Sequence, residues 1–180
     1  MNRTGRAFRP PESCTLTVGV LLAAGVDRQE VLRTLGEVLA PVEAVSPPIP
    51  FEGATYYEGE MGPGILRFHA ALGGLWDPEA LAEVKGRTGA LEARWARHGR
   101  RRVNLDPGWV NASQLVLATG KPAGYRVYVG RGVYAEVEYV FSHGSFRPLP
   151  WTYPDYREPA ALAFFNGIRT AHKRRTRRQR

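Results

Sequence analysis

The sequence has little cysteine and no residue spacing that is typical of a metal site. Cys14 is the single cysteine among 180 residues, which excludes an internal disulfide and a site built from several thiolates. The four histidines, His69, His98, His143 and His172, show neither HxH nor HExxH spacing. We therefore predict no metal site and name no cofactor. A reducing cytoplasm is the natural setting for a chain with one thiol.

Long apolar runs are also missing. The run LTVGVLLAAGV follows Arg3, Arg6 and Arg9, and this order resembles the charged and hydrophobic regions of a signal peptide. The run is too short to span a bilayer. It is followed at once by Asp27 and a helical pattern, as an opening β-strand would be. We expect a cytoplasmic chain with no membrane partner.

Acidic residues are absent from both ends of the sequence. The last twelve residues, RTAHKRRTRRQR, hold seven Lys/Arg, and the first eleven, MNRTGRAFRPP, hold three arginines. The net charge of +8 therefore comes from the ends, and the chain between them is close to neutral. Terminal runs of one sign are usually solvated. We expect residues 1–13 to form a flexible basic arm and residues 173–180 a basic tail, which either solubilises the protein or binds nucleic acid non-specifically.

The apolar residues that are present predict alternating strands and helices in the first half of the chain. Thr15–Leu22 is apolar on both faces and reads as a buried strand. Asp27 has capping-box spacing and opens a helix. Strands near 42–45 and 65–72 follow, and a second helix runs from Asp77-Pro78 to about residue 98. The order β-α-β-β-α is the opening of a ferredoxin-like fold.

The second half is rich in strand patterns. RRVNLDPGWV predicts a strand that turns at Asp-Pro-Gly, and a last helix is expected from about Glu158 to Lys173. Gly130-Arg-Gly132 formally begins a dinucleotide fingerprint, but VYAEVEYVF follows as a strand, so we interpret it as a hairpin turn. We predict one α+β domain over residues 14–172, with a mixed or antiparallel sheet and two to three packed helices.

Five blocks of this sequence resemble one family in order and spacing. They are MGPGILRF (61–68), RRVNLDPGWV (101–110), LVLATGKP (115–122), GVYAEVEYVF (132–141) and PLPWTYPDYR (148–157). The chain is similar to the bacterial and archaeal family catalogued as domain of unknown function 4416, over roughly residues 14–172. It departs from the family pattern at Trp109, where a tyrosine is more usual. The resemblance implies one compact domain and transfers no catalytic residue.

Cations and aromatic side chains gather in these same blocks, and they suggest the first function hypothesis. Arginines can surround an anion while tryptophan and tyrosine offer stacking faces. The domain would then hold a small anionic ligand, such as a nucleotide, a phosphorylated metabolite or an RNA end, between NLDPGW and PWTYPDYR. The ligand-binding candidates are Arg67, Arg102, Lys121, Trp109, Trp151 and Tyr153. Alternatively, these arginines form ion pairs with carboxylates on the surface, and such pairs contribute little to the stability of the fold.

Carboxylates carry the second hypothesis, a metal-assisted or acid–base hydrolase. Glu58, Glu60, Asp106 and Asp155 are the catalytic candidates, because such groups bind Mg²⁺ or exchange protons. Equally, an aspartate before Pro-Gly is a common turn former. A purely structural or interaction protein is a third hypothesis, so the sequence leaves open whether the protein is an enzyme.

The segment PLPWTYPDYREP (148–159) has two interpretations. Prolines with Trp151, Tyr153 and Tyr156 would form a rigid strap over a sheet edge. The same aromatic side chains would form a cleft wall, with Asp155 or Arg157 as its polar group. The two roles are compatible.

Overall fold

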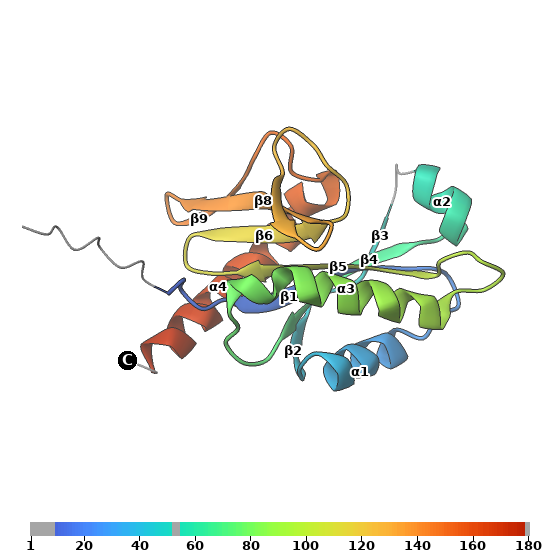
Figure 1. Cartoon of the computed structure of the whole chain (residues 1–180), viewed down its shortest axis with the longest axis horizontal. Coiled ribbons are helices and arrows are strands. Elements are labelled where there is room, and N and C mark those ends of the chain that lie inside the picture. The colour runs from blue at the N-terminus through green and yellow to red at the C-terminus, as the bar shows by residue number, and fades with distance from the viewer. Residues whose placement is uncertain (1–9, 52–54, 179–180) are drawn as a thin grey trace, which may run out of the picture.

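A nine-stranded sheet organises the part of the chain that the structure describes (Figure 1). This computed structural model describes residues 10–51 and 55–178. The strands are β1 (Thr15–Leu22), β2 (Val42–Val45), β3 (Ile49–Pro50), β4 (Leu66–Leu72), β5 (Val103–Val110), β6 (Gln114–Thr119), β7 (Val127–Gly130), β8 (Val133–Ser142) and β9 (Ser145–Pro148). Their order is β2-β4-β1-β5-β6-β8-β7, with β3 beside β4 and β9 beside β8. Every pairing in the described chain is antiparallel.

Helices cover both faces of this sheet. They are α1 (Arg28–Val38), α2 (Thr55–Met61), α3 (Leu81–Glu92) and α4 (Pro159–Arg177), with the short 3-10 helices η1 (Pro78–Ala80), η2 (Ala93–Trp95) and η3 (Pro154–Arg157). The prediction of an α+β fold with a mixed or antiparallel sheet is confirmed, and the sheet is a large antiparallel one. The expected number of two to three helices is wrong, because the described residues contain four α-helices. The extra helix, α2, is only seven residues long.

The alternation of side chains in β1 separates two cores. Leu16, Val18 and Val20 of β1 pack with α1 and α3 in one core. On the other face α4 packs Phe165 and Ile168 against β6, β8 and the end of β4. Every residue of β1 is buried, as its continuous apolar pattern predicted. α1 begins after Asp27, whose Oδ1 accepts a hydrogen bond from the Gln29 backbone N at 2.9 Å, as expected of its cap position.

Asp106-Pro107-Gly108 does not turn, and that prediction is wrong. The triplet lies inside β5, which pairs with β1 along its whole length. Side chains from α3 bond the backbone N and O of Leu105, so that residue's polar groups face away from β1, and Pro107 faces the same way. The missing N–H of Pro107 therefore interrupts no bond to β1. A Cβ on Gly108 would lie less than 3.0 Å from the Val116 carbonyl oxygen, so glycine permits β5 to approach β6.

Other expectations about the fold have mixed outcomes. β7 and β8 form the predicted hairpin around Gly130 and Gly132. The element order follows β-α-β-β-α only when β3 and α2 are left out, so a ferredoxin-like opening stays a prediction. The domain boundaries stay a prediction too. Residues 1–9 of the expected N-terminal arm and residues 179–180 of the tail lie outside the described part. Within that part, no helix combines the length and the apolar character needed to cross a bilayer.

Candidate functional site

A cleft opens where β5 and β6 separate. The two strands pair only between Gly108–Val110 and Leu115–Leu117, and they diverge beyond Gly108. The resulting cavity has a volume of about 1050 Å³, which is large enough for a small metabolite. It is lined by Ile49, Pro50, Phe51, Tyr56, Tyr57, Arg67, Lys85, Gly89, Glu92, Arg101, Asn104, Asp106, Leu117, Ala118, Thr119, Gly120, Lys121, Glu136, Tyr153, Pro154, Asp155, Tyr156 and Glu158.

Two side chains of α3 occupy the place that a neighbouring strand would fill beside β5. Glu92 Oε1 accepts a hydrogen bond from the Leu105 backbone N at 2.8 Å, and Lys85 Nζ donates to the Leu105 carbonyl oxygen at 3.1 Å. Burial raises the pKa of Glu92, although the bond from Leu105 opposes this effect. Lys85 also lies 3.4 Å from Asp106 Oδ1. α3 therefore satisfies the open edge of β5 and contributes charged groups to the cleft.

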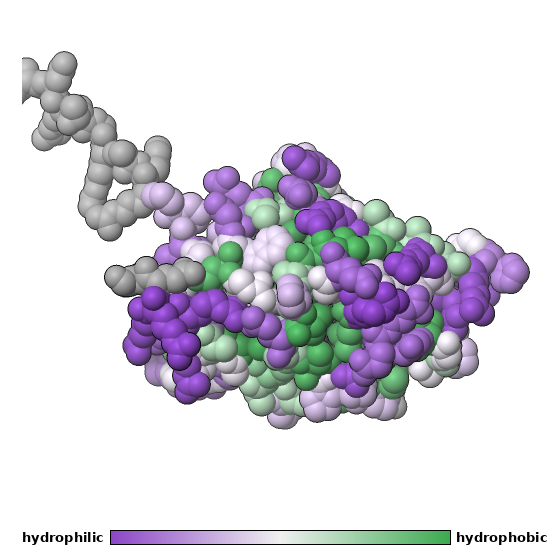
Figure 2. Space-filling view, turned by 90° about the horizontal axis from the view of Figure 1, so that it is seen from below, coloured by the Kyte–Doolittle hydropathy of each residue, from purple (hydrophilic) through white to green (hydrophobic). Residues whose placement is uncertain are grey.

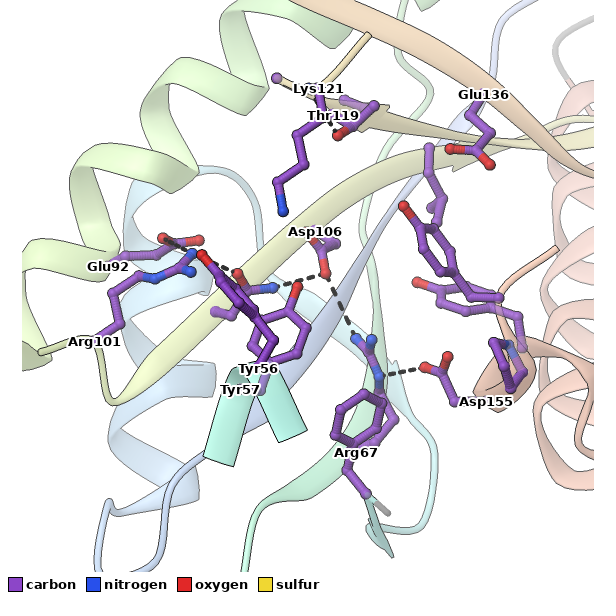
Figure 3. A pocket seen from close by; sticks show the side chains of 18 of the residues that line it. Tyr56, Tyr57, Arg67, Glu92, Arg101, Asp106, Thr119, Lys121, Glu136 and Asp155 are labelled. Atoms are coloured by element: carbon purple, nitrogen blue, oxygen red, sulfur yellow. Dashed lines mark hydrogen bonds and ion pairs between the residues drawn. The ribbon is translucent and has the colours of Figure 1, made fainter. Parts of the chain in front are cut away.

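Arg67 of β4 lies on the floor of the cleft between two carboxylates. Its side chain is 6% exposed, with Nε 2.6 Å from Asp155 Oδ2 and Nη1 3.8 Å from Asp106 Oδ2 (Figure 3). The contact with Asp106 is too long for a hydrogen bond and the contact with Asp155 is not aligned as one, so both nitrogens keep unused donor capacity. The ring centroid of Phe51 lies 5.3 Å from the guanidinium carbon. Arg67 joins β4, β5 and the strap segment at one point.

Two uncharged polar rings lie next to each other near Arg67, and of these Tyr156 lines the cavity whereas His69 does not. Burial, with the charge of Arg67, lowers the pKa of His69 well below its usual value, so the imidazole is uncharged near pH 7. Burial raises the pKa of Tyr156 well above its usual value, so its hydroxyl keeps its proton. The two rings are in edge contact, with centroids 4.7 Å apart. The Tyr156 hydroxyl has no hydrogen-bond partner among the described residues.

Arg101 fastens α2 to the side of the cleft. Its Nε and Nη2 donate to the two carboxylate oxygens of Glu60, each at 2.7 Å, and Nη1 donates to Asn104 Oδ1 at 2.9 Å. Asn104 Nδ2 in turn donates to Asp106 Oδ2 at 2.7 Å. The hydrogen bonds from Arg101 lower the pKa of Glu60 despite its partial burial. The position of Tyr57 on α2 is thereby linked to β5.

Arg126 connects three parts of the opposite wall. It donates to the Lys121 carbonyl oxygen at 2.9 Å, to Glu136 Oε2 at 2.7 Å and to the Tyr153 hydroxyl at 2.9 Å. These acceptors belong to the loop after β6, to β8 and to the strap segment. Arg126 does not itself line the cavity. It fixes the relative positions of three residues that do.

Lys121 differs from the other cations of the cleft. Arg67, Lys85 and Arg101 each contact carboxylates, whereas Lys121 has no ion-pair partner within residues 10–51 and 55–178. Its Nζ lies 5.1 Å from the centroid of the Tyr56 ring. Figure 3 shows the side chain extending from the loop after β6 into the cavity. Lys121 is thus an available cation beside an aromatic wall.

The structure brings together half of the predicted ligand-binding residues. Arg67, Lys121 and Tyr153 line the cleft. Trp109 packs in the core beneath α1 and α3. Arg102 donates to the Ala24 carbonyl oxygen at 2.6 Å, away from the cleft lining.

Trp151 likewise belongs to the scaffold. Its Nε1 donates to the Val137 carbonyl oxygen at 2.8 Å, and its ring stacks on Tyr125 with centroids 5.3 Å apart. The Thr152 hydroxyl bonds the Glu138 carbonyl oxygen at 2.6 Å, so this part of the segment covers an open edge of β8. The following residues of the segment, 153–156, form a wall of the cleft. The strap and the cleft wall therefore coexist.

The four predicted catalytic carboxylates do not share one position. Asp106 and Asp155 line the cleft and contact Arg67 from two sides. Glu60 is engaged by Arg101, and Glu58 is exposed on α2 outside the lining. Across the described ranges, no three His, Cys, Asp or Glu side chains are grouped closely enough to hold a metal ion.

Sequence reasoning missed the contribution of α3. Lys85 and Glu92 are seven residues apart, on the side of the helix that carries the buried Thr88. Charged residues on an otherwise inward-facing helical stripe were a usable signal, because such groups are rarely buried without a partner. Asn104 carried no comparable signal, since its role depends on Arg101 and on the separation of β5 from β6.

One of the comparisons with known proteins identifies the family. The family model described as Domain of unknown function (DUF4416) matches residues 12–172. The chain belongs to this family. No curated protein and no solved structure matches the chain. All residues that line the cleft lie within the matched range.

Proposed function

We propose that this family member binds a small molecule with a flat ring and a single anionic group in the cleft between β5 and β6. The observation that carries this proposal is Lys121, a cation without an ion-pair partner in the described chain, pointing into a cavity with aromatic walls. The aromatic lining consists of Phe51, Tyr56, Tyr57, Tyr153 and Tyr156. Such walls favour a planar ligand, because stacking on aromatic rings stabilises flat groups of many kinds.

The charge balance limits the anionic part of the ligand. Arg67 and Arg101 each contact two carboxylates, and Lys85 contacts one, so their charge is largely neutralised. Binding a polyphosphate requires several free cations or a metal ion. A carboxylate or a monophosphate matches better the single lysine of the cleft lining that has no ion-pair partner among the described residues. Of the earlier alternatives, this supports a nucleoside monophosphate or a phosphorylated metabolite over a triphosphate.

The acid–base alternative has narrower support. Asp106 and Asp155 face the same cleft on two sides of Arg67, which would allow one to accept and the other to return a proton. An enzyme of this kind would keep its affinity for ligand after Asp106→Asn while losing turnover. If Asp106→Asn lowered ligand affinity and turnover to the same extent, this result would count against the acid–base hypothesis. We also propose a cytoplasmic location, because Cys14 is a lone, buried thiol.

Calorimetry with defined probes tests the binding proposal. The probes are the four common nucleoside 5′-monophosphates, benzoate and 4-aminobenzoate at low ionic strength. At least one probe is expected to bind, and Lys121→Gln should weaken it by roughly tenfold, as expected when one charge-assisted hydrogen bond is removed. Lys173→Gln, on α4 away from the cleft, is the matched control and should bind as the unaltered protein does. No binding at millimolar probe, or full binding by Lys121→Gln, would refute the proposal.

A further inference from the structure

Glu136 of β8 presents an unsatisfied carboxylate oxygen at the cleft. Its side chain lines the cavity and is 1% exposed. Oε2 accepts a hydrogen bond from Arg126 Nε at 2.7 Å, but Oε1 has no partner among the described residues. A buried ionised oxygen without a donor lowers stability by more than one hydrogen bond contributes. The site therefore lacks one hydrogen-bond donor.

Arg126 determines where this oxygen lies. Because the same guanidinium bonds Glu136, the Lys121 carbonyl oxygen and the Tyr153 hydroxyl, these three groups are held in one arrangement. In Figure 3, Glu136 lies on the same side of the cavity as Thr119 and Lys121, across from Arg67 and Asp155. A fixed acceptor beside the Tyr153 ring, in a cavity that Lys121 also lines, is pre-organised for a ligand that carries a donor and an anion.

We infer that Glu136 Oε1 accepts a hydrogen bond from an amino group on the ring of the ligand, and that Arg126 is the positioning residue for Glu136. This inference rests on the proposed function, and it narrows the ligand class to amino-substituted rings that carry one anionic group. Adjacent Tyr153 contacts the ring, and Lys121 pairs with the anionic group. A ring that has only acceptors at this position leaves Oε1 unpaired and binds less tightly.

Two matched pairs of probes test this on the unaltered protein. The first pair is adenosine 5′-monophosphate and purine riboside 5′-monophosphate, which lacks the amino group. The second pair is 4-aminobenzoate and benzoate. Calorimetry at pH 7 should show the amino-bearing member of at least one pair binding roughly tenfold tighter or more, as for a hydrogen bond to a charged group. Equal affinities within both pairs overturn this inference and leave the proposed function standing. Absence of binding by all four overturns this inference, and it overturns the proposed function as well when the other nucleoside 5′-monophosphates also fail to bind.

Substitutions then test which residues cause the preference for the amino-bearing probe. Glu136→Gln should reduce the affinity ratio within the pair that shows it to about one, because the carboxylate is removed at nearly constant shape. Glu138→Gln is the matched control, since Glu138 is also buried on β8 but meets the Tyr153 backbone N instead of the cavity. Arg126→Gln should lower the ratio, and Arg126→Lys should restore part of it. A purely structural role for Arg126 would weaken both members of a pair equally, and an unchanged ratio in Glu136→Gln would overturn the assignment.

Discussion

Gly19 of β1 leaves the space that the Tyr156 hydroxyl occupies. A Cβ on Gly19 would lie less than 3.0 Å from that hydroxyl and 2.9 Å from Arg67 Nη1. Gly19 is paired with His69 on one side and with Asp106 on the other. A central strand therefore carries a residue without a side chain where the floor of the cleft requires room.

Substituting Gly19 with alanine should damage both the fold and the cleft. The added methyl group must displace Tyr156 or Arg67, neither of which has free space, so we expect unfolding free energy to fall by about 1–3 kcal/mol. Urea unfolding measures this change, and probe calorimetry should show weaker binding in the folded variant. Gly86→Ala is the matched control, because a Cβ on Gly86 meets nothing within 4 Å and the residue lies inside α3. That control should gain about 0.4–1 kcal/mol. Similar losses in both variants would contradict the close contact.

Stability should fall as the pH rises because of Glu138. Burial and the nearby Glu136 charge raise the pKa of Glu138 from 4.5 to about 8. Between those values the folded state holds a proton that the unfolded state has released. The stabilisation from the protonated group is therefore complete below pH 4.5, decreases up to about pH 8 and is absent above it.

Glu138→Gln provides the measurement for this pH dependence. Relative to the unaltered protein, the variant should gain about 1.4 kcal/mol of unfolding free energy for each pH unit between pH 5 and 8. Urea unfolding at several pH values gives the two slopes. Glu83→Gln, on the exposed side of α3, is the control and should keep the original slope. Parallel slopes for the unaltered protein and Glu138→Gln would contradict the raised pKa.

The bidentate bond from Arg101 to Glu60 should control the mobility of α2. Arg101→Lys retains the charge but loses the paired geometry. Because the Arg101 side chain is 31% exposed, we expect a stability loss of about 1 kcal/mol or less. Hydrogen exchange at α2 should nevertheless become faster. Arg33→Lys, in the exposed pair with Glu37 on α1, should leave local exchange unchanged. Unchanged protection of α2 in Arg101→Lys would show that other contacts hold this helix.

The basic end of the chain should bind polyanions from a helix. α4 continues to Arg177, and Arg175 bonds the Gly74 carbonyl oxygen and Glu43, so this end is fixed to the body. A hydrophilic patch surrounds it in Figure 2. The apolar face of α4 is buried against the sheet, which leaves no apolar face for a membrane surface and favours a phosphate backbone. Lys173, Arg174, Arg177 and Arg178 have no ion-pair partners in the described ranges.

Changing Arg174, Arg177 and Arg178 together to glutamine tests this surface. Binding to duplex DNA should weaken, and the slope of log affinity against log salt should fall by up to about 3, or about 0.9 for each phosphate that the variant no longer neutralises. The melting temperature should stay nearly constant, because these side chains are exposed. The exposed arginines at positions 94, 97 and 100, changed in the same way, form the control. If that control loses the DNA affinity instead, the basic surface is at the end of α3.

Local patterns predicted the elements whose shape depends on neighbouring residues in the chain. β1 was recognisable because its apolar residues are uninterrupted, and α1 because Asp27 caps it. The hairpin around Gly130 was recognisable because two strand patterns meet at a turn. In each of these elements, the residues that decide the structure lie within about ten positions of one another.

The cleft depends on contacts between distant residues, and this limited the sequence prediction. Pro107 had the signature of a turn, yet its orientation toward an open strand edge made it compatible with β5. Lys85 and Glu92 reach that edge only because β6 departs from β5. Arg67, Lys121 and Tyr153 were identified because charge and aromatic character mark them in any fold. Trp109 is also aromatic, but its side chain packs in a core. The residues next to it in the sequence did not indicate this orientation.

Because β5 separates from β6, side chains from the two sides of the sheet meet in one cavity. Lys85 and Glu92 come from the α3 layer and Tyr156 from the segment before α4, yet all of them line one cavity. An altered residue on the inward side of α3 would reach a bound ligand by direct contact and would need no strain transmitted through the strands. Residues that look like scaffold on one side of the sheet therefore line the same cavity as residues from its other side.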